Sequence, residues 1–153
     1  SVQVDYDPTQ ITYQELLEAF WAGHNPHQPT FSRQYASVIF YHNQEQRRAA
    51  EQAIAEQTEQ GGQVWTELLP AGEFTWAEDY HQKYFLRGRR DLLAELTRIY
   101  PDAQDLTNST AAARINGYLG GHGTLEQLEQ EIGALGLSEA GQQRLRDIVS
   151  ARF

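Results

Sequence analysis

The chain has 153 residues, of which 40% are hydrophobic and 22% charged, so its composition is that of a folded domain rather than a disordered segment. Its formal net charge of -9 repels phosphate backbones, which argues against a nucleic-acid partner. Cysteine and methionine are both absent, so the chain offers no disulfide, no zinc–thiolate site and no cysteine nucleophile.

The sequence shows no sign of a membrane segment or of a secretory signal. It holds no run of eighteen apolar residues, and the beginning, SVQVDYDP, lacks both a basic region and an apolar region. We therefore expect a cytoplasmic location and no membrane partner.

The first 70 residues are predicted to alternate between strands and helices. Apolar residues alternate over residues 2–6, which indicates a strand. A capping box of Thr12 and Glu15 opens a helix that ends at Gly23. A strand that could be buried on both faces, a helix and a third strand follow, at residues 35–41, 44–59 and 64–69. Helices of this length between strands are typical of crossovers, so some strand pairs should be parallel.

The rest of the chain is predicted to be helical. A short helix is expected at residues 78–86, and Leu92, Leu93, Leu96 and Ile99 mark the next. After Pro101 no strand signal remains, and three helices are expected. The first covers residues 108–119, the second begins at a capping box of Thr124 and Gln127, and the third covers residues 138–151. The predicted fold class is α+β, a mixed β-sheet with flanking helices over residues 1–100 and a helical extension over residues 101–153 that packs on it.

One short cluster, Glu78, Asp79, Tyr80 and His81, combines carboxylates, an imidazole and a phenol. A carboxylate beside an imidazole can raise its basicity and fix its tautomer. On an α-helix, however, residues two apart do not face each other, whereas Glu78 and Gln82 would. The other interpretation is therefore a helix N-terminus where the two carboxylates favour the helix dipole and His81 makes a structural hydrogen bond.

A second candidate region is the irregular loop at residues 24–34, which leads into a strand at Tyr35. Long loops in compact domains are often functional. His24 and His27 could ligate a metal, but Pro26 disfavours a helical placement and further ligands are missing, so no metal is expected.

Three phrases of this sequence resemble the A-type peptide methionine sulfoxide reductases. They are VQVDYDPTQITYQELLEAFWAGHNP, RQYASVIFYHNQEQ and TELLPAGEFTWAEDYHQKY, which together cover roughly the first 86 residues. The remainder, with NSTAAARINGYLGGHGTLEQLEQEIGALGLSE, resembles the C-terminal extension of one subgroup. The resemblance implies reduction of methionine-(S)-sulfoxide in peptides and proteins, with a thiol or thioredoxin as reductant and no bound cofactor.

In that family a cysteine thiolate attacks the sulfoxide sulfur, a glutamate protonates the oxygen and tyrosines hydrogen-bond to it. The resemblance implies substrate-binding roles for Tyr35 and its neighbour Gln34, and a supporting role for residues 78–81. Thr30 stands where the family usually has an aspartate. The cysteine and the glutamate lie in family segments upstream of the VQVDYDP-like phrase, so no catalytic residue is assigned within this chain.

Two readings therefore remain open. The chain is either a reductase domain recorded without its cysteine segment, or an inactive homologue that serves as a binding or interaction module. Both predict that the chain alone does not reduce sulfoxides, because a hydroxyl does not replace a thiolate as the nucleophile.

Overall fold

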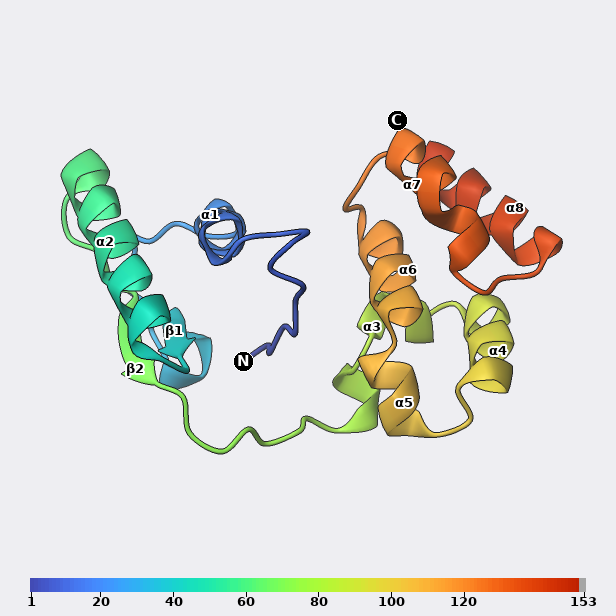
Figure 1. Cartoon of the computed structure of the whole chain (residues 1–153), viewed down its shortest axis with the longest axis horizontal. Coiled ribbons are helices and arrows are strands. Elements are labelled where there is room, and N and C mark those ends of the chain that lie inside the picture. Colours follow the sequence, from blue (N-terminus) through green and yellow to red (C-terminus); the bar gives the residue numbers. More distant parts are fainter. Residues whose placement is uncertain (152–153) are drawn as a thin grey trace. The chain divides into compact units, whose positions relative to one another are not determined.

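The computed structural model describes residues 1–151, and the chain divides into two compact units, Ser1–Phe74 and Thr75–Phe153. The first unit contains two helices, a 3₁₀ turn and two strands (Figure 1). In chain order these are α1 (Tyr13–Ala22), η1 (Arg33–Tyr35), β1 (Val38–Tyr41), α2 (Gln44–Gly61) and β2 (Glu67–Pro70).

Local sequence signals set the ends of both helices of the first unit. Thr12 and Glu15 form the predicted capping box, in which each side chain accepts the other's backbone N–H. The side chain of Asn43 caps α2 by accepting from the backbone N–H of Gln46, 2.9 Å away. The chain leaves α2 through Gly62, whose positive φ of 87° favours glycine.

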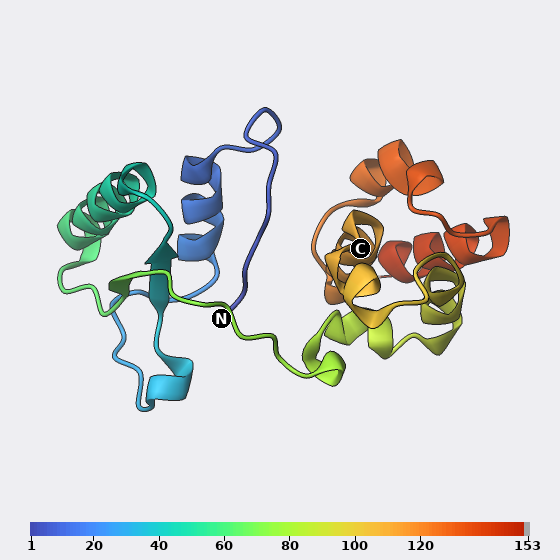
Figure 2. The ribbon, with the colours of Figure 1, turned by 60° about the horizontal axis from the view of Figure 1, so that its bottom comes forward.

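Strands β1 and β2 form a parallel pair with α2 as the crossover, as the sequence predicted. Ile39 pairs with Leu68 in the register and lies in a small core with Leu17 of α1 and Ala50 and Ala53 of α2. The three elements α1, α2 and β1 lie close together in Figure 2. Both helices contribute to this core, so it covers the face of β1 that carries Ile39.

Two strand predictions for the first unit are wrong. Residues 2–6 form no strand, and Val2 and Val4 are 88% and 57% exposed. Alternation alone does not make a strand, because a strand needs a hydrogen-bonded neighbour. The strand at β1 is not buried on both faces, since Phe40, which points away from Ile39, is 44% exposed. The predicted fold class, a sheet with flanking helices and a helical C-terminal region, is confirmed, and the two described strands of the sheet are parallel.

The second unit is helical, with no strand among its described residues. Its elements are η2 (Asp79–His81), α3 (Tyr84–Arg87), α4 (Arg90–Ile99), α5 (Ala103–Asn108), α6 (Thr110–Gly120), α7 (Leu125–Glu131), η3 (Ile132–Ala134) and α8 (Glu139–Ser150). The capping box of Thr124 and Gln127 opens α7 as predicted. Within residues 1–151, no helix combines the length and the apolar character that crossing a membrane would require.

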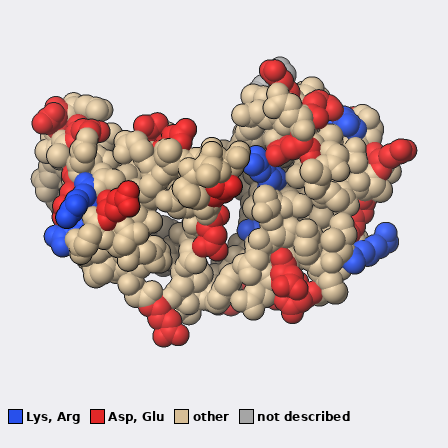
Figure 3. Space-filling view, in the orientation of Figure 1, with Lys and Arg blue, Asp and Glu red and all other residues tan. Residues whose placement is uncertain are grey.

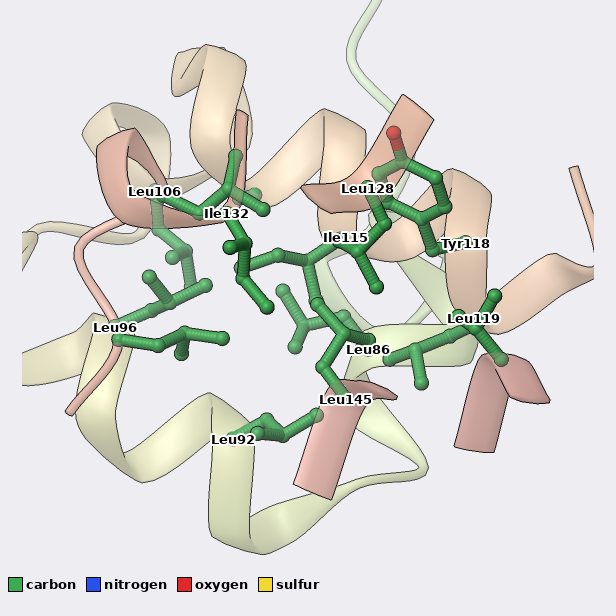
Figure 4. Close-up of a cluster of buried hydrophobic side chains, with 14 residues drawn as sticks. Leu86, Leu92, Leu96, Leu106, Ile115, Tyr118, Leu119, Leu128, Ile132 and Leu145 are labelled. Atoms are coloured by element: carbon green, nitrogen blue, oxygen red, sulfur yellow. The ribbon is translucent and has the colours of Figure 1, made fainter. Parts of the chain in front are cut away.

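A single hydrophobic core holds the second unit together (Figure 4). It gathers 14 buried residues from α3 to α8, and the fully buried Leu86, Leu92 and Leu96 come from the part before residue 100. The predicted boundary at residue 100 therefore falls inside this unit. The helices after residue 101 find their packing partners in α3 and α4.

The predicted helix at residues 108–119 begins two residues later and is preceded by an unpredicted short helix, α5. Ser109 separates the two, with an extended ψ of 126°. Its hydroxyl accepts from the backbone N–H of Ala112, 3.2 Å away. The serine thus offers the backbone a local alternative to a continuous helix.

Candidate functional site

The predicted substrate-binding residues Gln34 and Tyr35 lie together in the 3₁₀ turn η1. The hydroxyl of Ser32 accepts from the backbone N–H of Gln34, and the N–H of Tyr35 donates to the Ser32 carbonyl at 3.0 Å. Arg33 pairs with Glu67, which ties the turn to β2. Tyr35 is 74% exposed, so this residue lies on the surface of the unit.

The loop before this turn is fixed by its two histidines. Nδ1 of His24 lies 2.9 Å from the carbonyl of Phe20 and acts as a donor, which leaves Nε2 to face the hydroxyl of Thr66 at 3.5 Å. Nδ1 of His27 lies 3.2 Å from the carbonyl of Gln63. Both imidazoles therefore bind the loop to the segment that precedes β2.

Gly61 allows His27 this position. A Cβ on Gly61 would lie 2.2 Å from Nε2 of His27. The backbone N–H of Trp65 also donates to the carbonyl of Pro26 at 2.9 Å. The start of the loop is thus closely packed against the end of α2, while the turn at Tyr35 remains exposed.

The cluster at residues 78–81 is exposed and belongs to the second unit. Oε2 of Glu78 lies 3.9 Å from Nε2 of His81, and the rings of Tyr80 and His81 lie 4.2 Å apart. Asp79 begins the 3₁₀ turn, and its carbonyl accepts from the backbone N–H of Gln82. The structure therefore brings Glu78, Tyr80 and His81 together locally, whereas Gln34 and Tyr35 form their group within the other unit.

The predicted helix over residues 78–86 is interrupted. Lys83 adopts the left-handed conformation with φ 50°, unlike any other described residue that is not glycine. The preceding turn is a 3₁₀ helix, in which residues three apart are eclipsed, so Glu78 meets His81 rather than Gln82.

A polar cluster that the sequence did not reveal joins α6 to α7. The hydroxyl of Tyr118 donates to Oε1 of Glu131 at 2.6 Å, and Arg114 lies 3.1 Å from the other oxygen. These residues line a cavity of about 580 Å³ together with His122 and Gln127. Burial, followed by the hydrogen bond to Glu131, raises the pKa of Tyr118 to about 12. Partners thirteen residues apart on separate helices leave no local signal in the sequence.

Comparison with known protein families explains the resemblance of the sequence. The family model described as "Peptide methionine sulfoxide reductase" matches residues 1–114. The chain belongs to the peptide methionine sulfoxide reductase family. A second model, "Selenoprotein methionine sulfoxide reductase A, helical domain", matches residues 102–150, which include the Tyr118–Glu131 cluster.

Several curated reductases align with this chain. A "Peptide methionine sulfoxide reductase" of Drosophila melanogaster is 39% identical over 145 residues, which cover 93% of this chain and 58% of that protein. A "Peptide methionine sulfoxide reductase MsrA" of Methanosarcina acetivorans is 45% identical over 94 residues, 56% of this chain and 50% of its own length. The "Peptide methionine sulfoxide reductase A5" of Oryza sativa is 36% identical over 126 residues, which cover 76% of this chain and 48% of that protein. The chain thus spans about half the length of these reductases, and it contains no cysteine.

In the helical domain of this reductase-family chain, the raised pKa of Tyr118 predicts a dependence of stability on pH. The neutral phenol stabilises the folded state, fully so below the ordinary pKa of 10.0, and this contribution is lost as the pH rises through about 12. The advantage in unfolding free energy over a Tyr118→Phe variant should therefore shrink between these pH values. Urea unfolding at several pH values measures it, with Tyr100→Phe as the control. A constant difference across this range would contradict the prediction.

Proposed function

We propose that this chain supplies the sulfoxide-binding part of a peptide methionine sulfoxide reductase, and that its nucleophile comes from a cysteine-bearing segment outside these 153 residues. The observation that carries the proposal is the family match over residues 1–114 in a chain without cysteine. The substrate is methionine-(S)-sulfoxide in peptides or proteins, as the resemblance of the sequence implies.

The chemistry defines what each part must contribute. A cysteine thiolate attacks the sulfoxide sulfur, the oxygen passes to the cysteine as a sulfenic acid, and the substrate leaves as a thioether. Two thiol groups, from a small thiol or from thioredoxin, then reduce the sulfenic acid to the thiol: the first forms a mixed disulfide with release of water, and the second displaces the cysteine and leaves in the reductant's disulfide. The sulfoxide oxygen gains negative charge during the attack, so a hydrogen-bond donor aimed at it lowers the barrier.

Tyr35 is the residue of this chain that best fits the donor role. Its phenol is exposed, its backbone is held by Ser32, and the neighbouring Arg33 is paired with Glu67. The amide of Gln34 stands beside it in the same turn and can bind the peptide. We assign supporting roles to Glu78, Asp79, Tyr80 and His81.

A titration of the full chain with a methionine-(S)-sulfoxide peptide tests this proposal. We expect binding, and we expect Tyr35→Phe to weaken it about fivefold, the value of one hydrogen bond near 1 kcal/mol. Tyr100→Phe is the matched control, because Tyr100 belongs to the second unit and lies outside both the turn at Tyr35 and the cluster at residues 78–81. Equal affinity for the sulfoxide peptide and its unoxidised counterpart would refute a sulfoxide site.

The second candidate function is a binding module without turnover, and the absence of cysteine favours it equally. A complementation experiment separates the two. A separate segment that carries the cysteine motif of the family, from upstream of the VQVDYDP-like phrase, is added or fused to the chain. Restored reduction supports the enzyme reading, whereas sulfoxide binding without any restored reduction supports the module.

We further propose that thioredoxin reduces the complete enzyme and that the enzyme acts in the cytoplasm.

A further inference from the structure

A groove with a volume of about 480 Å³ is formed entirely by residues of the second unit. Its walls are aromatic, with the rings of Tyr84 and Phe85 5.6 Å apart in an edge-to-face arrangement and Tyr80 beside them. Leu119 of α6 and Ile148 of α8 add aliphatic surface. The groove therefore presents apolar surface together with exposed rings, which are typical of a peptide-binding surface.

The wall at α3 is held in place by α6. Helix α3 begins after the left-handed Lys83 and has no side-chain cap of its own. Instead, Oδ1 of Asn116 accepts from the backbone N–H groups of Phe85 and Leu86, at 3.0 and 3.2 Å. Gly120 lets the Phe85 ring lie against α6, since a Cβ there would be 2.9 Å from the ring. The groove is thus preformed, which lowers the entropic cost of binding.

The charge of the groove is opposite to that of the chain. The chain carries a net charge of -9, and acidic side chains are scattered over the face in Figure 3. Among the residues described by the structure, the groove lining nevertheless includes Arg87 and Arg89 and no carboxylate. A positively charged groove on an otherwise acidic protein favours an anionic partner.

Both arginines retain donors for such a partner. Nε of Arg87 donates to the carbonyl of Gln82 at 2.8 Å, which orients the guanidinium and leaves its terminal nitrogens for a ligand. Nε of Arg89 is 3.8 Å from Asp91, whose carboxylate makes a shorter bond of 2.7 Å to Arg144. Asp91 therefore leaves N–H donors of the Arg89 guanidinium for a ligand.

We propose that this groove binds an acidic peptide segment of another protein, with apolar side chains between the aromatic rings and carboxylates on Arg87 and Arg89. Guanidinium groups bind carboxylates in a bidentate manner, and aromatic walls bind apolar side chains. Two cations on a protein of net charge -9 are too few to offset repulsion of a nucleic-acid backbone, which disfavours that alternative. The groove shares Tyr80 with the proposed supporting residues, but the inference does not depend on sulfoxide binding.

The test uses a fluorescein-labelled peptide of alternating Phe-Leu and Glu-Glu pairs, without methionine, titrated with the full chain and followed by fluorescence anisotropy. We expect binding that weakens with salt, and affinity about tenfold lower for the same peptide with lysine in place of glutamate. Arg89→Gln and Tyr84→Ala should each weaken binding about threefold to tenfold. Arg98→Gln, which removes an exposed arginine of α4 outside the groove, should leave it unchanged.

Circular dichroism shows whether each variant keeps its fold, and amide chemical shifts locate the bound peptide independently of any substitution. Shifts confined to residues of the groove support the inference. Equal affinity for the glutamate and lysine peptides overturns it, as does tighter binding of an oligothymidylate. Self-association in sedimentation experiments that excludes the peptide also overturns it, because the groove would then bind a second copy of the chain.

Discussion

A methionine-(S)-sulfoxide peptide incubated with this chain and dithiothreitol should be reduced no faster than in dithiothreitol alone. The chain contains no cysteine, and the attack on the sulfoxide sulfur requires a thiolate. Serine and threonine hydroxyls are not ionised at neutral pH, so they do not substitute for it. Tyr35 can stabilise a developing charge, but the chain holds no thiolate in position to attack a sulfoxide bound there.

The measurement is the amount of methionine peptide formed over time, separated by chromatography. The Methanosarcina acetivorans reductase, which is 45% identical over 94 residues, provides the positive control under the same conditions. Turnover above background that grows in proportion to the concentration of the chain would refute the conclusion drawn from the missing cysteine.

Replacing Leu86 with alanine should destabilise the second unit by about 3 kcal/mol. Leu86 is fully buried in the centre of the helical core, with Leu92, Leu119 and Leu145 in the same cluster (Figure 4). Removing its isobutyl group forfeits apolar burial and leaves a cavity that surrounding helices fill only in part. The effect should appear as faster hydrogen exchange throughout α4, α6 and α8, because all three share this core.

The control for this substitution is Ile99→Ala, which removes a branched side chain that is 48% exposed. It should cost less than half as much, since about half of the surface of Ile99 is already in water. Hydrogen exchange is preferable to a single melting curve, because a chain of two compact units need not unfold in one step. If Leu86→Ala left exchange in α4 and α8 unchanged, the proposed central position of Leu86 would be wrong.

Local chemistry made much of the fold predictable. Thr12 with Glu15 and Thr124 with Gln127 mark two helix starts, because a capping box is satisfied within four consecutive residues. The parallel pair β1 and β2 followed from the length of the helix between them. The two capping boxes are local interactions, and the length of the helix between the strands can be read directly from the sequence.

Features that depend on distant residues escaped prediction. The helix that follows Lys83 is capped by a distant residue. The side chain of Asn116 accepts hydrogen bonds from the backbone N–H groups of Phe85 and Leu86, which lie thirty-one and thirty residues earlier in the chain. Apolar alternation at Val2 and Val4 predicted a strand, but no described neighbour pairs with it. The groove of Arg87 and Arg89 is likewise assembled from helices that are far apart in sequence.

The substrate residues were assigned by resemblance rather than by pattern. Nothing in the spacing of Gln34 and Tyr35 distinguishes them from an ordinary turn. The structure adds their exposure and the hydrogen bonds that their backbone N–H groups donate to Ser32. The roles of Glu78, Asp79, Tyr80 and His81 stay predictions. Glu78 and His81, which are three residues apart, meet in a 3₁₀ turn where the sequence predicted an α-helix.

The shared core of the second unit determines where recombination could divide such a protein. The two family models meet and overlap at residues 102–114, which would suggest a junction there. A crossover at that point would separate Leu86, Leu92 and Leu96 from the helices that bury them. A junction near Phe74, between the compact units, would keep both cores whole. Chimeras that exchange the helical part among reductases should therefore include the segment from Thr75 onward.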